Sequence, residues 1–192
     1  MLKEVVFDIE TQNSFAEVEN DVRKFKISVV SVYRYETGEF RSFVESELNQ
    51  LWPILEKADR LIGYNSEHFD LPVLMNYYAG DLTKIPHLDL MKEVKSGIGI
   101  RLKMDDLAQA TLDNVKKSAD GLQAIRWYKE GKIDEIKKYC EQDVNVTKQL
   151  YEFGRDNHQL FYKSLAGDVV PFAVNFSMPV NSTAKINLTL PF

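Results

Sequence analysis

The sequence predicts an α/β protein in which a mixed β-sheet is flanked by helices on both faces. Short apolar segments rich in Val, Tyr and Phe come first, and segments with helical periodicity alternate with further short strands after them. Strands followed by alternating elements favour a mixed sheet covered on both sides. The 192 residues are 44% hydrophobic and 28% charged, so the chain can bury a substantial core.

The individual elements follow from periodicity and from turn residues. The predicted strands are 3–9, 27–35, 39–44, 60–64 and 87–90. The predicted helices are Leu48–Lys57, 70–79, 104–111, 120–129 and 133–153. Thr37 and Gly38 are typical of a tight turn, so the second and third strands are expected to form a hairpin. The first strand then becomes central, and its end can border a cleft.

Two acidic residues interrupt the first apolar strand, in the segment VVFDIET. Residues two apart project to the same face of a strand, so Asp8 and Glu10 point together while Phe7 and Ile9 point the other way. Like charges this close in a partly dry site are costly unless protons or a cation offset them. Carboxylate oxygens suit Mg²⁺ or Mn²⁺. A pair of such ions about 3.5 to 4 Å apart can hold the attacking and leaving oxygens of a phosphodiester.

A second acidic site is predicted on the last long helix. Its apolar positions Ile133, Ile136, Cys140, Val144 and Thr147 follow the three-and-four spacing of an amphipathic helix. Tyr139 and Asp143 are four apart beside that stripe, so both can face one cleft. An unperturbed phenol titrates near pH ~10, so Tyr139 is suited to orienting a water molecule rather than to removing its proton.

Three segments together resemble a known family. They are FDIET, the pattern N-x-x-x-F-D from Asn65 to Asp70, and Y-x-x-x-D from Tyr139 to Asp143. In type and order they resemble the DEDD (DnaQ-like) superfamily of ribonuclease H-like 3′ to 5′ exonucleases, over about residues 3 to 153. The Tyr four residues before the final Asp is typical of the DEDDy branch, and within it the chain looks closest to bacterial YprB-type domains.

The resemblance implies a fold, a function and a set of site residues. The fold would be a ribonuclease H-like mixed sheet. The activity would be metal-dependent 3′ to 5′ release of nucleoside monophosphates from single-stranded DNA or RNA, with two Mg²⁺ or Mn²⁺ ions. The metal ligands would be Asp8, Glu10, Asp70 and Asp143, with Tyr139 positioning the water. A residue that wedges or stacks on a base commonly follows the first motif in these relatives. Expected substrate contacts are Thr11, Gln12, Asn65 and Phe69, with Asn13 and Phe15 as further candidates for the stacking residue.

Each motif also has a simpler interpretation. Asp-x-Glu at a strand end and Tyr and Asp at helical spacing are common surface features, and Asp70 could merely open a helix in its first turn. Two other function classes stay open. One is a catalytically inactive nucleic-acid-binding or scaffold domain, and the other is a ribonuclease H-type endonuclease.

Charge and composition limit the partners. The net charge of −5 argues against a protein that coats nucleic acid, although not against a nuclease. Basic residues cluster at Lys92, Lys95, Arg101 and Lys103, where Gly97 and Gly99 would allow movement around a strand, and again at Lys116, Lys117 and Arg126. These basic residues are either solvated surface residues or contacts to the substrate. His68, His87 and His158 lack the spacing of a zinc site, and phosphate-loop and serine-hydrolase motifs are absent.

Cellular location follows from weaker signals. The single cysteine, Cys140, excludes an intramolecular disulfide and is expected to serve in packing. The first apolar run is broken by Asp8 and Glu10, so neither a signal peptide nor a membrane span is expected. These observations favour a cytoplasmic protein.

The C-terminal residues lie outside the motif pattern. We divide the chain into a catalytic domain, 1–155, and a β-hairpin extension, 156–192. Apolar residues alternate with polar residues or proline from Val170 to Val180 and again from Ile186 to Phe192, which predicts a hairpin turning at 181–185. Its apolar face would be buried on the catalytic domain, on a second copy or on a protein partner. Self-association or docking through this hairpin is therefore expected.

Overall fold

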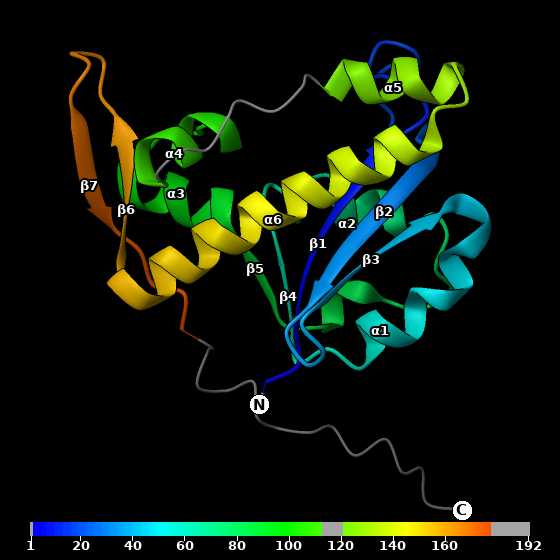
Figure 1. Cartoon of the computed structure of the whole chain (residues 1–192), viewed down its shortest axis with the longest axis horizontal. Helices are drawn as coiled ribbons and strands as arrows, with labels where there is room; N and C mark the ends of the chain where they lie inside the picture. Colours follow the sequence, from blue (N-terminus) through cyan, green and yellow to red (C-terminus); the bar gives the residue numbers. More distant parts are fainter. Residues whose placement is uncertain (1, 113–120, 178–192) are drawn as a thin grey trace, which may run out of the picture.

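The computed structural model describes residues 2–112 and 121–177 and shows a five-stranded mixed sheet with helices on both faces (Figure 1). The strand order is β3-β2-β1-β4-β5. The strands are β1 (Glu4–Thr11), β2 (Ile27–Arg34), β3 (Glu39–Val44), β4 (Arg60–Gly63) and β5 (His87–Asp89). β1 pairs antiparallel with β2 and parallel with β4, so it is the central strand, as predicted.

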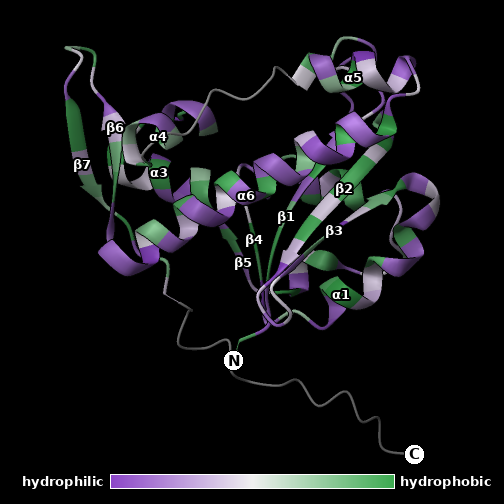
Figure 2. Cartoon of the chain, in the orientation of Figure 1, coloured by the Kyte–Doolittle hydropathy of each residue, from purple (hydrophilic) through white to green (hydrophobic). Residues whose placement is uncertain are grey.

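The helices divide between the two faces of the sheet. They are α1 (Trp52–Glu56), α2 (Asp70–Leu74), α3 (Leu90–Ile98), α4 (Met104–Thr111), α5 (Gly121–Lys129) and α6 (Ile133–Asn157), with 3-10 turns η1 (Val22–Lys24), η2 (Glu45–Gln50) and η3 (Leu82–Lys84). α6 crosses one face, and Figure 2 shows that its outer side is mostly hydrophilic. Burial of its apolar stripe against the sheet explains why this long helix forms.

Alternation along β1 feeds two different cores. Val5, Phe7 and Ile9 are buried in the core that also contains residues of α1 and α2. The opposite face carries Val6, which is buried together with residues of α6. Asp8 and Glu10 alternate in phase with Val6, and their partners across the ladder in β2 are Ser31 and Val29. The strand therefore presents both carboxylates to α6.

Several predicted elements differ in extent. The predicted helix Leu48–Lys57 is a 3-10 turn, η2, followed by the five-residue helix α1, with Pro53 in the first turn of α1. The helix predicted over 70–79 ends at Leu74, because Asn76 and Tyr77 are held by hydrogen bonds to Val22, Ile27 and Glu45 in other segments.

The helix α3 was not predicted, and it contains part of the basic segment that was expected to move. Gly99 ends α3 in the left-handed region, at φ 79°. Gly97 lies where an added Cβ would come within 2.8 Å of the Phe172 ring. Both glycines thus have a structural role: one caps the helix and the other permits close packing.

The structure describes a C-terminal hairpin in which only one strand was predicted. A hairpin is present, but its strands are β6 (Gln159–Lys163) and β7 (Val169–Ala173), which pair antiparallel. The first predicted strand, Val170–Val180, overlaps β7, whose partner precedes it in the chain. The second predicted strand and the turn at 181–185 lie outside the described residues. The domain boundary at 155/156 stays a prediction.

The apolar face of this segment packs on the rest of the chain. Phe172, Val174 and Phe176 are each at most 8% exposed and share a core with residues of α3, α4 and α6. Of the three burial sites expected for this face, the described residues show the first, since it packs on the preceding part of this chain.

A buried ion pair fixes the end of the described segment. Arg60 and Glu4, which are 3% and 7% exposed, form a salt bridge, and the Tyr151 hydroxyl lies 2.9 Å from Glu4 Oε2. Arg60 Nη1 also donates to the carbonyl oxygen of Phe176 at 2.8 Å. The Phe176 ring covers Gly154, where a Cβ would come within 2.2 Å of it. This contact lies near the start of β1, away from Asp8 and Glu10.

We expect Phe176→Ala to lower the free energy of unfolding by about 3 to 5 kcal/mol, the usual cost of removing a buried phenylalanine ring. The smaller side chain leaves a cavity over Gly154 that the glycine cannot fill. Urea unfolding checks this, with Phe40→Ala, at a ring that is 37% exposed, as the matched control. Equal losses for the two variants would contradict the packing described for Phe176.

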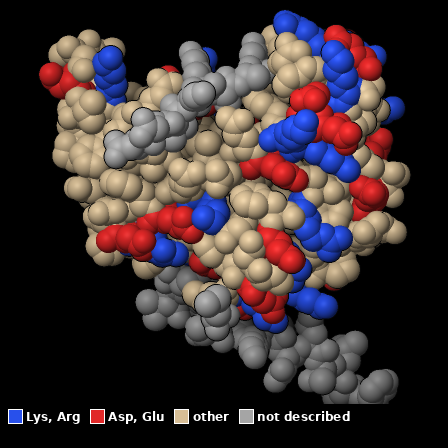
Figure 3. Space-filling model, viewed as in Figure 1, with Lys and Arg blue, Asp and Glu red and all other residues tan. Residues whose placement is uncertain are grey.

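Two surface properties bear on partners. None of the helices in the described ranges is both long and apolar enough to cross a membrane. On the face in Figure 3, acidic and basic side chains are intermingled and do not separate by sign. That face therefore offers no broad basic surface for nucleic acid.

Candidate metal centre

Asp8, Glu10 and Asp143 form a cluster that could hold a metal ion. Each offers a carboxylate oxygen, and the three oxygens lie within 4.8 Å of one another. Glu10 and Asp143 are buried and Asp8 is half-buried. Strand β1 supplies the first two by alternation, and α6 supplies the third. The structure therefore brings together two of the three predicted motifs directly.

Asp70, the last residue of the second motif, contacts the same strand. β1 pairs with β4 only as far as Val6, so the backbone N–H groups further along β1 lack a strand partner on that side. Asp70, the first residue of α2, accepts a hydrogen bond from Ile9 N at 3.2 Å through Oδ1. The residue between the two β1 carboxylates is thus bound to the second motif, which holds Asp70 beside them.

Tyr139 lies one turn before Asp143 on α6, and its side chain hydrogen-bonds the Asp143 carboxylate. Asp143 Oδ1 is buried and has no hydrogen-bond partner among the described residues. A buried carboxylate oxygen without a partner is costly, since it has lost its water and gained nothing in return. A cation is the group that this oxygen and its neighbours best accommodate.

The electrostatics of the cluster support this. Burial raises the pKa of Asp8 well above its ordinary value, and the charges of Asp70, Asp143 and Glu10 raise it further. Burial also raises the pKa of Glu10 well above its ordinary value, and the charges of Asp143 and Asp70 raise it further. Burial raises the pKa of Asp70 and of Asp143 to about 7 each. Four carboxylates that resist ionisation together are the donors that a hard divalent ion stabilises.

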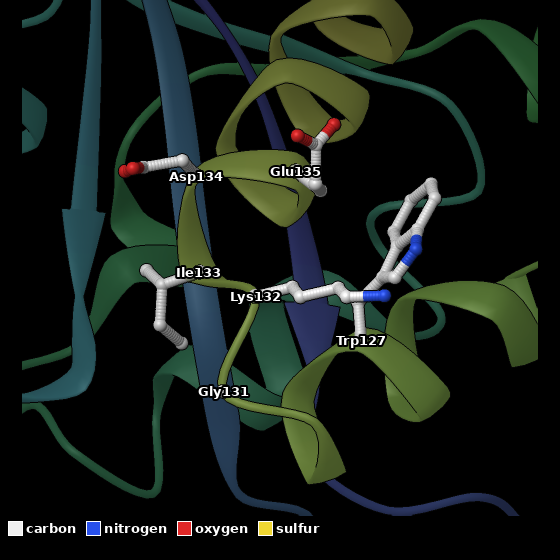
Figure 4. A pocket seen from close by; sticks show the side chains of 6 residues that line it. All are labelled: Trp127, Gly131, Lys132, Ile133, Asp134 and Glu135. Carbon is white, nitrogen blue, oxygen red and sulfur yellow. The ribbon is translucent and has the colours of Figure 1, made fainter.

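A pocket lies next to Tyr139, at the start of α6. Its volume is about 500 Å³, and its lining includes Trp127, Lys132 and Glu135. Figure 4 shows the Lys132 side chain extending toward Trp127, while Asp134 points to the other side. The Trp127 ring also contacts the Tyr139 ring edge-on, with centroids 6.1 Å apart. Trp127 is half-buried, so it serves both as packing for Tyr139 and as a wall of the pocket.

The candidates for substrate contact after the first motif divide into two groups. The side chains of Thr11, Gln12 and Asn13 all bond within the protein: Thr11 to Asn13 O, Gln12 to Ile27 O and Glu45, and Asn13 to the backbone of Lys24 and Lys26. Phe15 is different, because its ring is 51% exposed. It packs on Phe69, directly before Asp70, with centroids 5.3 Å apart. Of this group, Phe15 presents the exposed apolar surface.

Asn65 occupies a constrained position in the second motif. Its φ is 61°, in the left-handed region that asparagine tolerates better than most residues. Its backbone N–H donates to Asp89 Oδ1 at 2.8 Å, and its side-chain oxygen accepts from Arg101. The predicted contact residue is therefore held between β5 and the segment that follows α3.

Sequence reasoning missed three residues next to the centre. Asp105, in the first turn of α4, lies close enough for its charge to raise the pKa of Asp143. Asp89 ends β5, and its charge raises the pKa of Asp70. Cys140, expected only to pack, has its thiol 3.5 Å from Asp8 Oδ2 and donates to it. No short motif marks these residues. Only Cys140 could have been found from the sequence, because it directly follows Tyr139 on the same helix.

Comparison with known proteins agrees with the fold. A family model described as RNase_H superfamily matches residues 5–153. The structure is similar to that of the family B DNA polymerase from the hyperthermophilic archaeon Pyrobaculum calidifontis, with a TM-score of 0.60 and 17% sequence identity. The similarity covers 80% of this chain and 24% of the polymerase chain, so it concerns a part of that protein and shows the fold alone. No curated protein matches the sequence.

Proposed function

Because the chain belongs to the RNase_H superfamily and its carboxylates converge on one end of the central strand, we propose that it is a metal-dependent nuclease that removes nucleotides from the 3′ end of single-stranded nucleic acid. The proposal includes two Mg²⁺ or Mn²⁺ ions and the release of nucleoside monophosphates. It also includes the DEDDy assignment, which rests on Tyr139 and Asp143.

The observation that carries the proposal is that Asp143, which clusters with Asp8 and Glu10, has a buried Oδ1 with no hydrogen-bond partner among the described residues. Bound divalent ions would offset the charge that develops on the phosphate and lower the pKa of the attacking water. Asp8, Glu10, Asp70 and Asp143 would hold the ions. A catalytically inactive scaffold would have no need to gather four carboxylates in which the charges of Asp70 and Asp143 raise the pKa values of Asp8 and Glu10.

The other residues would bind and orient. Tyr139 donates its hydroxyl proton to Asp143 and its ring contacts Trp127, so its oxygen can accept a hydrogen bond from a water at one place in the cleft. The exposed Phe15 ring can stack on a terminal base, a contact worth about 1 to 3 kcal/mol in single-strand binders. The polymerase relative acts on DNA by its name, which makes DNA the first substrate to try.

A nuclease assay on end-labelled strands tests the proposal. A 5′-labelled single strand with Mg²⁺ should give a ladder of products that shorten by one nucleotide, and chelation of the metal should stop it. Internal cuts in an RNA–DNA hybrid would instead indicate a ribonuclease H-type endonuclease. No cleavage of DNA or RNA would leave a binding or scaffold domain. Matched DNA and RNA strands in parallel identify the sugar preference.

We expect Tyr139→Phe to lower kcat by about 10- to 100-fold. The change removes one hydrogen bond to a charged group, worth about 1.5 to 3 kcal/mol, and leaves the ring packing on Trp127 in place. Steady-state kinetics checks this, with Tyr162→Phe in β6 as the matched control. An unchanged kcat would remove Tyr139 from the mechanism without removing the metal cluster.

A further inference from the structure

A second polar pocket lies beside the proposed centre, on the side of α3. Its volume is about 170 Å³, and its lining includes Asn65, Asp89, Lys95 and Arg101. Asp89 links it to the carboxylates, since its charge raises the pKa of Asp70. The loop from Asn65 leads directly to Asp70, so a strand that reaches the centre could pass over this pocket.

Charge within this pocket is positive on balance. The negative charge of Asp89 is met by backbone N–H groups of Asn65, Glu67 and Met91. Glu67 is neutralised by Lys92, at 2.8 Å. Among the described residues, Lys95 and Arg101 form no ion pair with any carboxylate. With Lys92 paired to Glu67, Lys95 and Arg101 outweigh Asp89 by one positive charge, in a chain whose net charge is −5.

Arg101 is held in place by neutral groups. Its guanidinium donates to Asn65 Oδ1 and to Met91 Sδ, the latter at 3.2 Å. The next residue, Leu102, accepts a hydrogen bond from the Tyr64 hydroxyl at 2.9 Å through its carbonyl oxygen. These contacts fix the side chain without cancelling its charge, which is the state that binds a phosphate with little loss of entropy.

We infer that this pocket binds a backbone phosphate of the substrate strand beside the metal centre, with Arg101 and Lys95 as its contacts. The inference rests on the proposed function and adds a binding subsite to it. Arg101 would bind the phosphate while its guanidinium also donates to Asn65, so phosphate binding would help to position the second motif. Specificity for the base would not arise here, because phosphates carry no sequence information.

Affinity measured against salt tests the subsite. With Ca²⁺ in place of Mg²⁺ and an end-labelled single strand, Arg101→Gln and Lys95→Gln should each weaken binding, about tenfold for Arg101. Each should lower the slope of log affinity against log salt by about 0.7, the value for one phosphate contact on a single strand. With Mg²⁺, KM should rise while kcat changes less than twofold. Lys57→Gln, at the end of α1, is the matched control.

A modified substrate separates contact from structural support. The test strands each carry one neutral methylphosphonate in place of a phosphate, at successive positions. The replacement should weaken binding of the wild-type protein at one position near the 3′ end. At that position it should cause no further loss of affinity in Arg101→Gln. Arg101→Lys should keep the salt slope and lose part of the affinity.

The two proposals fail differently. If wild-type protein neither binds nor cleaves any strand, the proposed function fails. If it does both and the Arg101 and Lys95 variants match Lys57→Gln, the phosphate subsite alone is overturned. Additive losses at every methylphosphonate position would also overturn it.

Discussion

Asp8→Asn and Asp143→Asn are each expected to abolish turnover, with kcat falling by about 10³-fold or more, equivalent to about 4 kcal/mol of transition-state stabilisation. Each amide keeps the shape of the carboxylate and loses its charge. The two positions belong to different elements, β1 and α6, whose oxygens lie within 4.8 Å of each other and of Glu10. Each change would therefore remove one proposed ligand from a shared cluster.

Steady-state kinetics with Mg²⁺ on a labelled single strand measures this effect. Asp168→Asn, in the turn between β6 and β7, is the matched control and should retain full activity. Circular dichroism and the melting temperature of both site variants should show a folded protein. Wild-type rates from either variant would refute the assignment of the metal centre.

The second expected result concerns stability without metal. In the folded protein, burial raises the pKa of Asp70 and of Asp143 from 3.8 to about 7. Between these values the folded state binds more protons than the unfolded state, so the free energy of unfolding falls as the pH rises from about 4 to about 7. Each pKa unit corresponds to about 1.4 kcal/mol, or about 3 to 6 °C in melting temperature for a chain of this size.

Removing one of the charges should reverse that loss. Asp70→Asn can still accept the hydrogen bond from Ile9 N, so we expect it to melt at a higher temperature than wild type at pH 8 in EDTA. The difference should vanish near pH 4, and Mg²⁺ should stabilise wild type more than the variant. Thermal melts over this pH range, with and without Mg²⁺, check the result. A variant that is less stable at pH 8 would show that the buried charge of Asp70 does not destabilise the metal-free protein.

The clustering of Asp8, Glu10 and Asp143 could be predicted from the sequence because their positions follow from local geometry. Asp8 and Glu10 face one side by strand alternation, and Tyr139 and Asp143 share a side by helical spacing. Asp70 was the harder residue, since its place beside β1 depends on where β4 stops pairing. Its identification came from the family resemblance, whereas periodicity indicated only the start of a helix.

The missed elements depend on contacts between distant segments. The glycines in α3 look like helix breakers, but Gly97 is required because Phe172 approaches closely. In the C-terminal hairpin, β7 shows clear alternation while its partner β6 does not, so the sequence indicates β7 but not β6. Asp105 and Asp89 come from segments without a motif. Tertiary packing alone brings them to the centre.

The alternation of β1 has a consequence for folding. Its ladder pairs Asp8 with Ser31 and Glu10 with Val29. A slip of one residue would turn Phe7 and Ile9 toward α6 and place both acids in the apolar layer opposite. A misregistered molecule would thus be both unstable and inert, so enzymatic turnover would serve as a direct reporter of whether this strand had found its proper alignment.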